Sequence, residues 1–284
     1  MRSLQEIQAK EQSMQVLVGL TSVFEGIASL RIAQIKSQVL QSQAFFGELW
    51  HMYTQMREGT AFQFGRGEDG HKLINKELVI IITAEGGFSG DIDEKLISLV
   101  LQNYDEKHQD IIVIGHHGAI RLAHSGVHFK KYYRLPTRDV DINVTPIIKD
   151  VQQYRSTTVF YQTYVSLGVQ DVKRIELSTA VQEQGKHSKR TGDEISEATY
   201  IFEPSTQAVV NHLESSMLHI ALSQVILESK LAQYASRFRA MNAAHTKAKD
   251  SLDGVFLEYS RAKRGIKDER LKEIINGLRK VQTA

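Results

Sequence analysis

The sequence predicts an α/β protein in which a long antiparallel coiled coil of N- and C-terminal helices flanks a small Rossmann-like α/β domain inserted between them. Two observations predict this fold. Apolar residues recur at heptad spacing near both ends of the 284-residue chain, and short β-branched apolar runs lie between those two regions. All three prolines fall between residues 136 and 204, so neither end carries the strongest helix breaker. The expected segments are a coiled-coil helix over 1–57, an α/β domain over 58–204 and a second coiled-coil helix over 205–284.

Each end carries a stripe of mostly apolar residues at alternating spacings of three and four. The stripes run through residues 4–56 and 213–266, and the second is interrupted by Gln224 and His245. An apolar seven-residue repeat of this length predicts a left-handed supercoil, because a straight helix would rotate the stripe away from its partner. We interpret His245 as a packed or hydrogen-bonded interruption and Gln224 as a position that sets helix register in the same way.

The predicted helices are too long for a compact domain of this size. At about 1.5 Å per residue they would measure roughly 80 and 110 Å. The apolar stripe changes phase after Gly265, so the last turns are expected to face something other than the first seam. The polar tail of the longer helix must therefore protrude or be covered by another protein.

The middle of the chain changes to the pattern of a sheet. Short apolar runs bounded by turn residues predict two buried parallel strands, a helix between them and three further strands. The strands are expected over 77–83, 110–115, 157–161, 172–177 and 198–202, the helix over 91–103, and an exposed polar loop over 182–194.

Composition excludes several classes of protein. The chain has no cysteine, which rules out disulfide frameworks and thiolate metal sites. Its net charge of +2 gives no reason to expect binding to nucleic acid or to a lipid surface. No apolar stretch is expected to reach the roughly 20 residues that span a bilayer, and the first residues lack the apolar core of a signal peptide. We therefore expect membrane association only through partners.

A series of motifs in the expected order resembles the gamma subunits of rotary F-type ATP synthases. Residues 237–244 resemble the family's Arg-Met-x-Ala-Met-x-x-Ala signature, and 259–266 resemble its Tyr-Asn-x-Ala-Arg-Gln segment. Further similarity lies at residues 82–90, 114–118, 200–204 and 273–277. Because the motifs cover the whole chain in order, the chain is identified as a divergent, bacterial-type member of this family.

The N-terminal helix departs from the family pattern. The family has a basic Thr-x-Lys-Ile-Thr-x-Ala-Met segment where this chain has the uncharged residues 16–24. In the family this neighbourhood touches the catalytic head, so the electrostatics of that contact should differ here.

The resemblance implies a central-stalk rotor that carries torque between an ion-driven membrane ring and the catalytic head, and so couples proton or sodium transport to ATP synthesis or hydrolysis. It implies as partners the nucleotide-binding alpha and beta subunits, the epsilon subunit and the c-ring. The location it implies is the cytoplasmic face of the bacterial plasma membrane. The chain itself is expected to be a non-catalytic subunit, without catalytic residues, cofactor or metal.

The resemblance also implies a set of head contacts on the C-terminal helix: Arg237, Arg239, Arg261, Lys263 and Arg264. At Arg264 the family has Gln, so a charge-assisted contact with a carboxylate becomes possible here. The alternative for Arg261, Lys263 and Arg264 is that they only solvate a helix face. The alternative for Arg237 and Arg239 is a packing role, and Met241 beside them is expected to belong to the core.

Enzyme motifs are not found in the sequence. It contains no Gly-x-x-x-x-Gly-Lys-Ser/Thr phosphate loop, and the glycine-rich residues 86–90 lack the spacing of a dinucleotide loop. His116 and His117 are adjacent and would point to opposite sides of a strand, so we expect loop residues and no joint metal ligation. Ser89 has no recognisable neighbouring base.

Two rival interpretations remain open at this point. A coiled-coil scaffold with an inserted α/β module would explain the heptads equally well, but not the ordered motifs. An enzyme that binds a ligand at the strand ends and oligomerises through its helices is the other rival. The missing acid, base and phosphate motifs count against it.

Overall fold

A computed structural model describes residues 4–56, 74–137, 139, 142–186, 201 and 203–282 of the chain. By their internal contacts the residues divide into two compact units, 1–27 with 238–284, and 28–237. Two long helices, α1 (Leu4–Met56) and α6 (Thr206–Gln282), contribute residues to both units. We call the two units the helical unit and the sheet unit.

In the helical unit α1 and α6 pack as antiparallel helices. The Thr21 hydroxyl lies 3.3 Å from Nδ1 of His245, and Nδ2 of Asn242 donates a 2.9 Å hydrogen bond to Glu25. Moving forward along α1 therefore means moving backward along α6. His245 also lies 3.3 Å from the Val18 carbonyl oxygen, so the expected hydrogen-bonded interruption of the seam is confirmed.

The predicted heptad stripes mark the buried faces of both helices. Every stripe position from 4 to 56 on α1 is buried or half-buried, as is every position from 213 to 262 on α6. Ile266 is exposed, and so are Leu271, Ile274 and Leu278 after the change of phase. The helix–helix seam thus ends near the point where the repeat changes phase.

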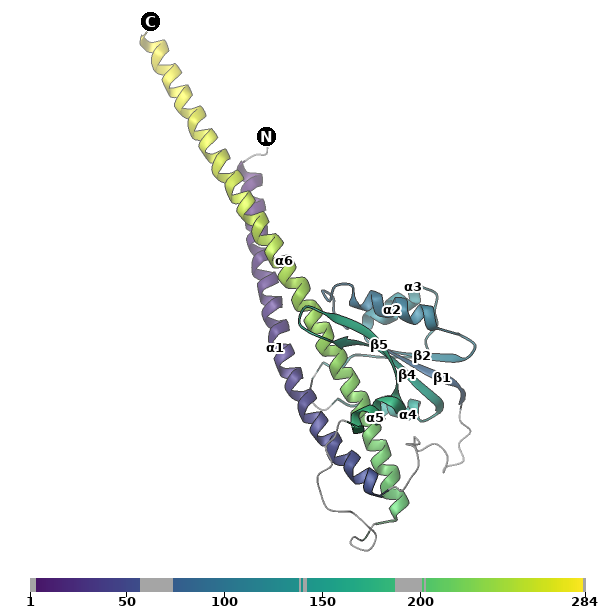
Figure 1. Ribbon diagram of the computed structural model, residues 1–284. Helices are drawn as coiled ribbons and strands as arrows, with labels where there is room; N and C mark the ends of the chain where they lie inside the picture. The colour runs from purple at the N-terminus through teal and green to yellow at the C-terminus, as the bar shows by residue number, and fades with distance from the viewer. Residues whose placement is uncertain are drawn as a thin grey trace. The chain divides into compact units, whose positions relative to one another are not determined.

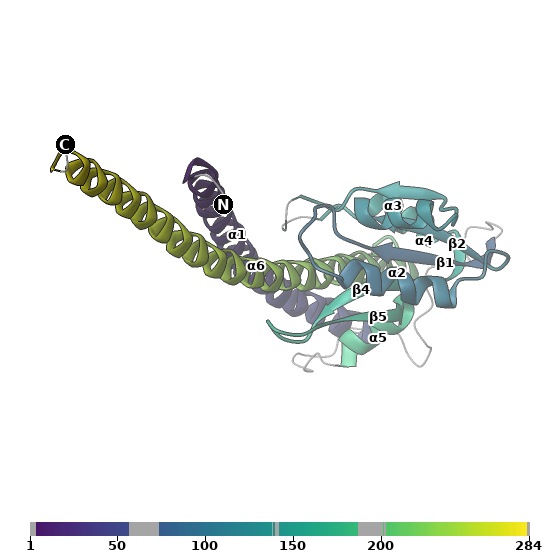
Figure 2. The same cartoon turned by 90° about the horizontal axis from the view of Figure 1, so that it is seen from above.

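The sheet unit is built on a five-stranded mixed sheet in the order β3-β2-β1-β4-β5. Its strands are β1 (Ile74–Ile82), β2 (Gln109–Ile114), β3 (Lys131–Tyr133), β4 (Tyr154–Tyr164) and β5 (Gln170–Glu176). The first four run parallel, and β5 pairs antiparallel with β4 at one edge, as Figure 2 shows. The expected parallel pairing of β1 with β2 is confirmed.

Helices cover both faces of this sheet (Figure 1). Alternate residues of β1 point to opposite faces, with Val79 and Ile81 on one and Leu78, Ile80 and Ile82 on the other. The first face packs against α2 (Ile92–Asn103) and α3 (His116–His124). The second packs against α4 (Thr145–Val151), α5 (Leu177–Lys186) and the parts of α1 and α6 that belong to this unit. The result is a three-layer α/β arrangement around a doubly covered sheet.

A buried ion pair ties α6 to the segment between β3 and α4. The Lys230 ammonium group, whose side chain is 2% exposed, pairs with Asp139 and donates a 2.7 Å hydrogen bond to the Pro136 carbonyl oxygen. Arg31 on α1 lies 3.2 Å from the other oxygen of Asp139. One buried carboxylate therefore joins three segments of the sheet unit.

Four elements were not anticipated from the sequence, one predicted loop needs correction, and one predicted strand is largely untested. The elements α3, α4, α5 and β3 are additional. Residues 182–186 of the expected exposed loop form the end of α5. Most of the expected strand at 198–202 lies outside the described residues, and Ile201 is not in a strand. Short helices whose length is set by tertiary packing leave little periodicity to detect.

The N-terminal helix is more apolar than expected. Among the described residues α1 contains an 18-residue window long and apolar enough to cross a membrane by length and composition, and 11% of that window is buried. The expectation that no apolar stretch approaches this length is therefore wrong. The window contains no long unbroken apolar run, because Gly, Ser and Thr residues interrupt it. These residues add no charge, so the mean hydropathy of the window stays high.

Candidate functional site

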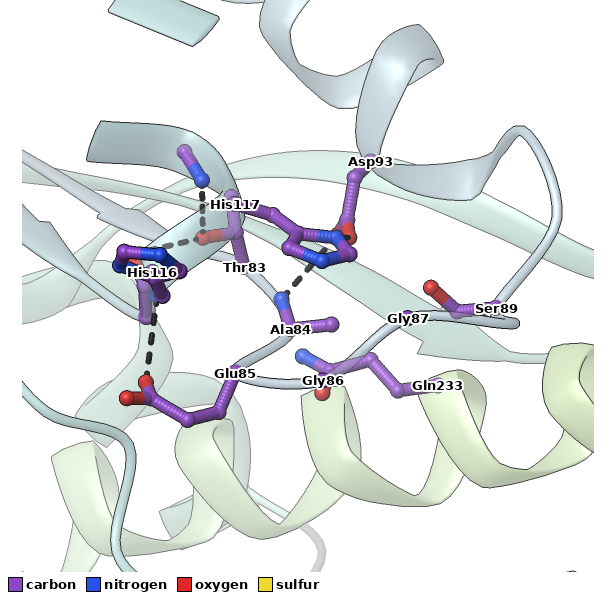
Figure 3. A network of polar contacts seen from close by, with 12 residues as sticks. Thr83, Ala84, Glu85, Gly86, Gly87, Ser89, Asp93, His116, His117 and Gln233 are labelled. Atoms are coloured by element: carbon purple, nitrogen blue, oxygen red, sulfur yellow. Dashed lines mark hydrogen bonds and ion pairs between the residues drawn. The ribbon is translucent and has the colours of Figure 1, made fainter. Parts of the chain in front are cut away.

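The candidate site lies at the carboxyl ends of β1 and β4, where the order in which the chain adds strands to the sheet reverses. The chain adds β2 and β3 on one side of β1 and then returns to place β4 on the other side. In α/β sheets such a switch point is the usual place for a ligand. The loop 83–90 follows β1 here, so we call these residues the switch loop (Figure 3).

The beginning of the switch loop is held by a close approach of two backbones. Thr83 is fully buried, and its hydroxyl accepts a 2.9 Å hydrogen bond from the Gly118 amide. A Cβ atom added to Gly115 would lie 2.1 Å from the Thr83 carbonyl oxygen, and one on Gly118 would lie 2.7 Å from the Thr83 side chain. The two glycines of the segment 115–118 are therefore required by space, and by a positive φ of 101° at Gly115.

Asp93 at the start of α2 organises the centre of the site. The residue is 3% exposed, and its carboxylate accepts hydrogen bonds from the Ala84 amide at 3.2 Å and from Nε2 of Gln162 at 2.7 Å. Its second oxygen lies 3.1 Å from Nδ1 of His117 on α3 (Figure 3). One carboxylate thus connects the switch loop, β4 and α3.

Side chains of α6 fill the space beyond this carboxylate. The side-chain oxygen of Gln162, Oε1, accepts hydrogen bonds from the Ser229 hydroxyl and from Nε2 of Gln233. The Ser236 hydroxyl donates a 2.6 Å hydrogen bond to the Ser89 carbonyl oxygen. Ser229, Gln233 and Ser236 are buried. They occupy the crevice at the strand ends in which other open α/β sheets bind a ligand. The arrangement fastens the α/β layers to the long helix.

Arg237 closes the same contact from the solvent side. Its guanidinium donates 3.1 Å hydrogen bonds to the carbonyl oxygens of Gly86 and Gly87 and lies 5.3 Å from the ring of Tyr234. Arg237 thus clamps the switch loop within the sheet unit, a role that local sequence did not reveal.

Glu85 braces the opposite side of the loop. Its carboxylate accepts hydrogen bonds from the backbone amides of His116 and Leu135 and from the Tyr132 hydroxyl. Partial burial, together with the Glu85 carboxylate, raises the pKa of Tyr132. A tyrosine hydroxyl is protonated at neutral pH even at its ordinary pKa of about 10, so this group is a donor there.

Asp93→Ala should lower the free energy of unfolding by about 2–4 kcal/mol, because it leaves the Ala84 amide and the Gln162 amide group buried without their acceptor. Glu94→Ala on the same helix removes only an exposed pair with Arg121 and should cost less than about 1 kcal/mol. Urea unfolding followed by Trp50 fluorescence measures both. Equal effects of the two substitutions would contradict the assigned role of Asp93.

The remaining predicted head contacts lie on the surface of α6. Arg239 is exposed, as are Arg261, Lys263 and Arg264, and the Lys263 ammonium lies 5.8 Å from the ring of Tyr259. Met241 is buried, as expected of a core residue. The structure brings Arg261, Lys263 and Arg264 within one helical turn, whereas Arg237 belongs to the sheet unit.

The histidine pair is placed differently from the prediction. His116 and His117 open α3 and do not lie on a strand or in a loop. Only the ring of His117 joins the polar network, through Asp93. Within the described part of the chain, no group of three or more His, Cys, Asp or Glu side chains could hold a metal ion.

Comparison with known proteins decides the family. The family model described as ATP synthase matches residues 3–280. The chain belongs to the ATP synthase family. Within it, the chain is 21% identical to the ATP synthase gamma chain of Chlorobaculum parvum and 23% identical to that of Staphylococcus aureus, with 98% of each chain covered in both comparisons. The predicted identity as an ATP synthase gamma subunit is thereby confirmed.

Solved ATP synthase structures have the same fold. The chain matches a subunit of the mitochondrial ATP synthase of Euglena gracilis with a TM-score of 0.64 and 12% identity, covering 97% of this chain and 93% of that one. It matches a chain from the central stalk and c-ring of the Tetrahymena thermophila enzyme with a TM-score of 0.58 and 16% identity, covering 79% and 99%. The predicted coiled coil with an inserted α/β domain is therefore confirmed as the fold of this ATP synthase subunit.

Proposed function

We propose that this gamma subunit is the central-stalk rotor that transmits torque between the membrane ring and the nucleotide-binding head. It would thereby couple proton or sodium transport to ATP synthesis or hydrolysis. The observation that carries the proposal is similarity to gamma chains over 98% of the length, including both long helices. A shaft without two-fold or three-fold symmetry would present a different side to each catalytic subunit and so favour a different conformation in each.

The proposed partners are the alpha and beta subunits of the head, the epsilon subunit and the c-ring. The helical segments 1–57 and 205–284 would contact the head. The α/β domain, 58–204, would contact epsilon and the ring. The site of action would be the cytoplasmic face of the bacterial plasma membrane. The chain would contribute no catalytic residue, which agrees with the filling of the switch point by Ser229 and Gln233.

The proposed head contacts are Arg237, Arg239, Arg261, Lys263 and Arg264, of which the last three form the most compact group. Arg261 and Arg264 are three positions apart on an exposed helix and so lie on the same side of it. Such a pair suits a carboxylate on the head, since charge-assisted hydrogen bonds are stronger than neutral ones. Arg264 can offer two parallel donors to such a carboxylate, which a Gln at this position could not.

Arg261→Ala combined with Arg264→Ala should reduce the torque of the reconstituted head and weaken its binding by about tenfold, as expected for the loss of charged hydrogen bonds. The control is Lys247→Ala with Lys249→Ala, two exposed cations on the same helix in the same unit. ATP-driven rotation of a bead attached to the shaft measures torque directly. Equal loss in both double variants would indicate a general effect of charge, and unchanged torque in the first would reject this contact.

A further inference from the structure

A row of polar side chains on α6 joins this helix to the rest of the sheet unit. It covers residues 228–237, about three turns, and it ends at the last residue of α6 that belongs to this unit. Just before it, over 217–227, the buried residues of α6 are mostly apolar and pack in the core of the unit. We call the following residues the polar row: Glu228, Ser229, Lys230, Gln233, Ser236 and Arg237.

The polar row bonds to three different segments of the sheet unit. Glu228 and Gln233 form hydrogen bonds with side chains of β4. Ser236 and Arg237 donate hydrogen bonds to carbonyl oxygens of the switch loop. Lys230 binds the segment between β3 and α4 through its ion pair and its hydrogen bond to a carbonyl oxygen. One stretch of helix is therefore held by a strand, a loop and a connecting segment at once.

These bonds leave α6 in several directions around its axis. At about 100° per residue, with Glu228 taken as 0°, Gln233 lies at about 140° and Lys230 at about 200°. Apolar contacts hold a helix against a sheet, but they are non-directional and resist rotation about the helix axis only weakly. Hydrogen bonds spread over about 200° resist it more strongly, because turning the helix either way lengthens or bends a bond on one side.

We propose that the polar row is the joint through which torque passes between the α/β layers and α6. The inference rests on the proposed function and adds to it the internal contact that carries the load within this chain. The apolar core holds α6 on the sheet, and the polar row stops the helix from slipping around its own axis. Stability and torque transmission therefore depend on different contacts, which makes the two separable by mutation.

A triple variant, Thr163→Val with Glu228→Leu and Gln233→Leu, weakens the joint without leaving an unpaired polar atom at these bonds. The Thr163 hydroxyl donates to the Glu228 carboxylate, and both groups are removed together. Oε1 of Gln162 loses Gln233 but keeps the Ser229 hydroxyl. Replacing both partners of a hydrogen bond by apolar groups is nearly neutral, so the melting temperature should fall by less than about 4 °C.

Gln224→Leu is the matched control. Gln224 is a buried residue on the same helix in the same unit, and its Oε1 has no hydrogen-bond partner within the described part of the chain. The control therefore makes the same change of side chain as Gln233→Leu without removing a bond of the polar row. It should change neither the melting temperature nor the transmission of torque.

The measurement follows ATP-driven rotation of a bead on the full chain reconstituted with the head subunits. The chain has no cysteine, so one introduced cysteine can carry the bead. Lys107→Cys places it on an exposed turn of the α/β domain, and His212→Cys places it on α6 itself. Angular fluctuations of the bead during pauses give the torsional stiffness between the bead and the head.

The two attachment sites should respond differently to the triple variant. From Lys107→Cys torque must cross the polar row, so the stiffness should fall by about a third or more, because one of three sets of bonds is weakened. From His212→Cys the torque runs along α6, so the stiffness should match that of the wild type. Gln224→Leu should match the wild type at both sites.

Several outcomes would overturn the inference. If the wild type does not rotate, the proposed rotor function itself fails. If the wild type rotates and the triple variant keeps its stiffness from Lys107→Cys, the rotor function stands and the polar row is not the joint. An equal fall from both attachment sites, or a fall in Gln224→Leu, would indicate general softening and would also reject it. If the triple variant does not fold, Gln233→Leu alone takes its place, and unchanged stiffness there rejects the inference.

Discussion

Gly115→Ala should lower the free energy of unfolding by about 2–6 kcal/mol, enough at the upper end to leave much of the chain unfolded or insoluble. Two costs add at this position. The backbone has φ of 101° and ψ of 141°, a conformation that side chains rarely adopt, and it costs about 1–3 kcal/mol. The new Cβ would also lie 2.1 Å from the Thr83 carbonyl oxygen, so the backbone at the end of β1 must move. Such overpacking costs about 1–3 kcal/mol more.

Gly126→Ala is the matched control for Gly115→Ala. Gly126 also has a positive φ, of 72°, but an added Cβ would meet nothing within 4 Å. The control should cost only about 1 kcal/mol, the strain of a left-handed residue. Urea unfolding followed by Trp50 fluorescence compares the two, and equal destabilisation would mean that the contact with Thr83 does not matter.

Lys230→Met should lower the free energy of unfolding by about 3–5 kcal/mol. The substitution keeps most of the side-chain volume but removes the buried partner of Asp139 and the donor to the Pro136 carbonyl oxygen. The Arg31 guanidinium would remain, yet its side chain is 42% exposed and cannot replace a buried ammonium. The carboxylate would then be buried with too little compensation, a far larger cost than the loss of a surface ion pair.

Two further variants separate this explanation from a simple packing defect. Arg31→Met should cost less than about 1 kcal/mol, because a half-exposed pair contributes little. Lys230→Met combined with Asp139→Leu should recover most of the stability lost in the single variant, because the unpaired charge is gone. A double variant no more stable than Lys230→Met would contradict the assigned role of the ion pair.

The long elements of this fold could be predicted from sequence because each depends on a local period. The buried positions of α1 and α6 follow the heptads within each unit, and the apolar runs mark β1, β2, β4 and β5. The missed elements have weaker local signals. Pro146 near the first turn of α4 was an available signal, since proline is favoured there. The three residues of β3 are too few to show a period.

The polar network could not have been predicted in the same way. Asp93, Gln162 and Gln233 are separated by about 70 residues at each step, and each looks like an ordinary polar residue in its own segment. Only the switch in strand order brings them together. Arg237 shows the same limit, because the family motif marks the residue but not its hydrogen bonds to Gly86 and Gly87.

The central claim is that this chain works as a rotor between a nucleotide-binding head and a membrane ring. The most direct test is to purify the tagged chain from its native membranes and to identify its partners by mass spectrometry. The account predicts recovery of the alpha, beta and epsilon subunits together with the c subunit. A clean preparation that contains the intact chain without the head subunits would contradict it and would favour a coiled-coil scaffold.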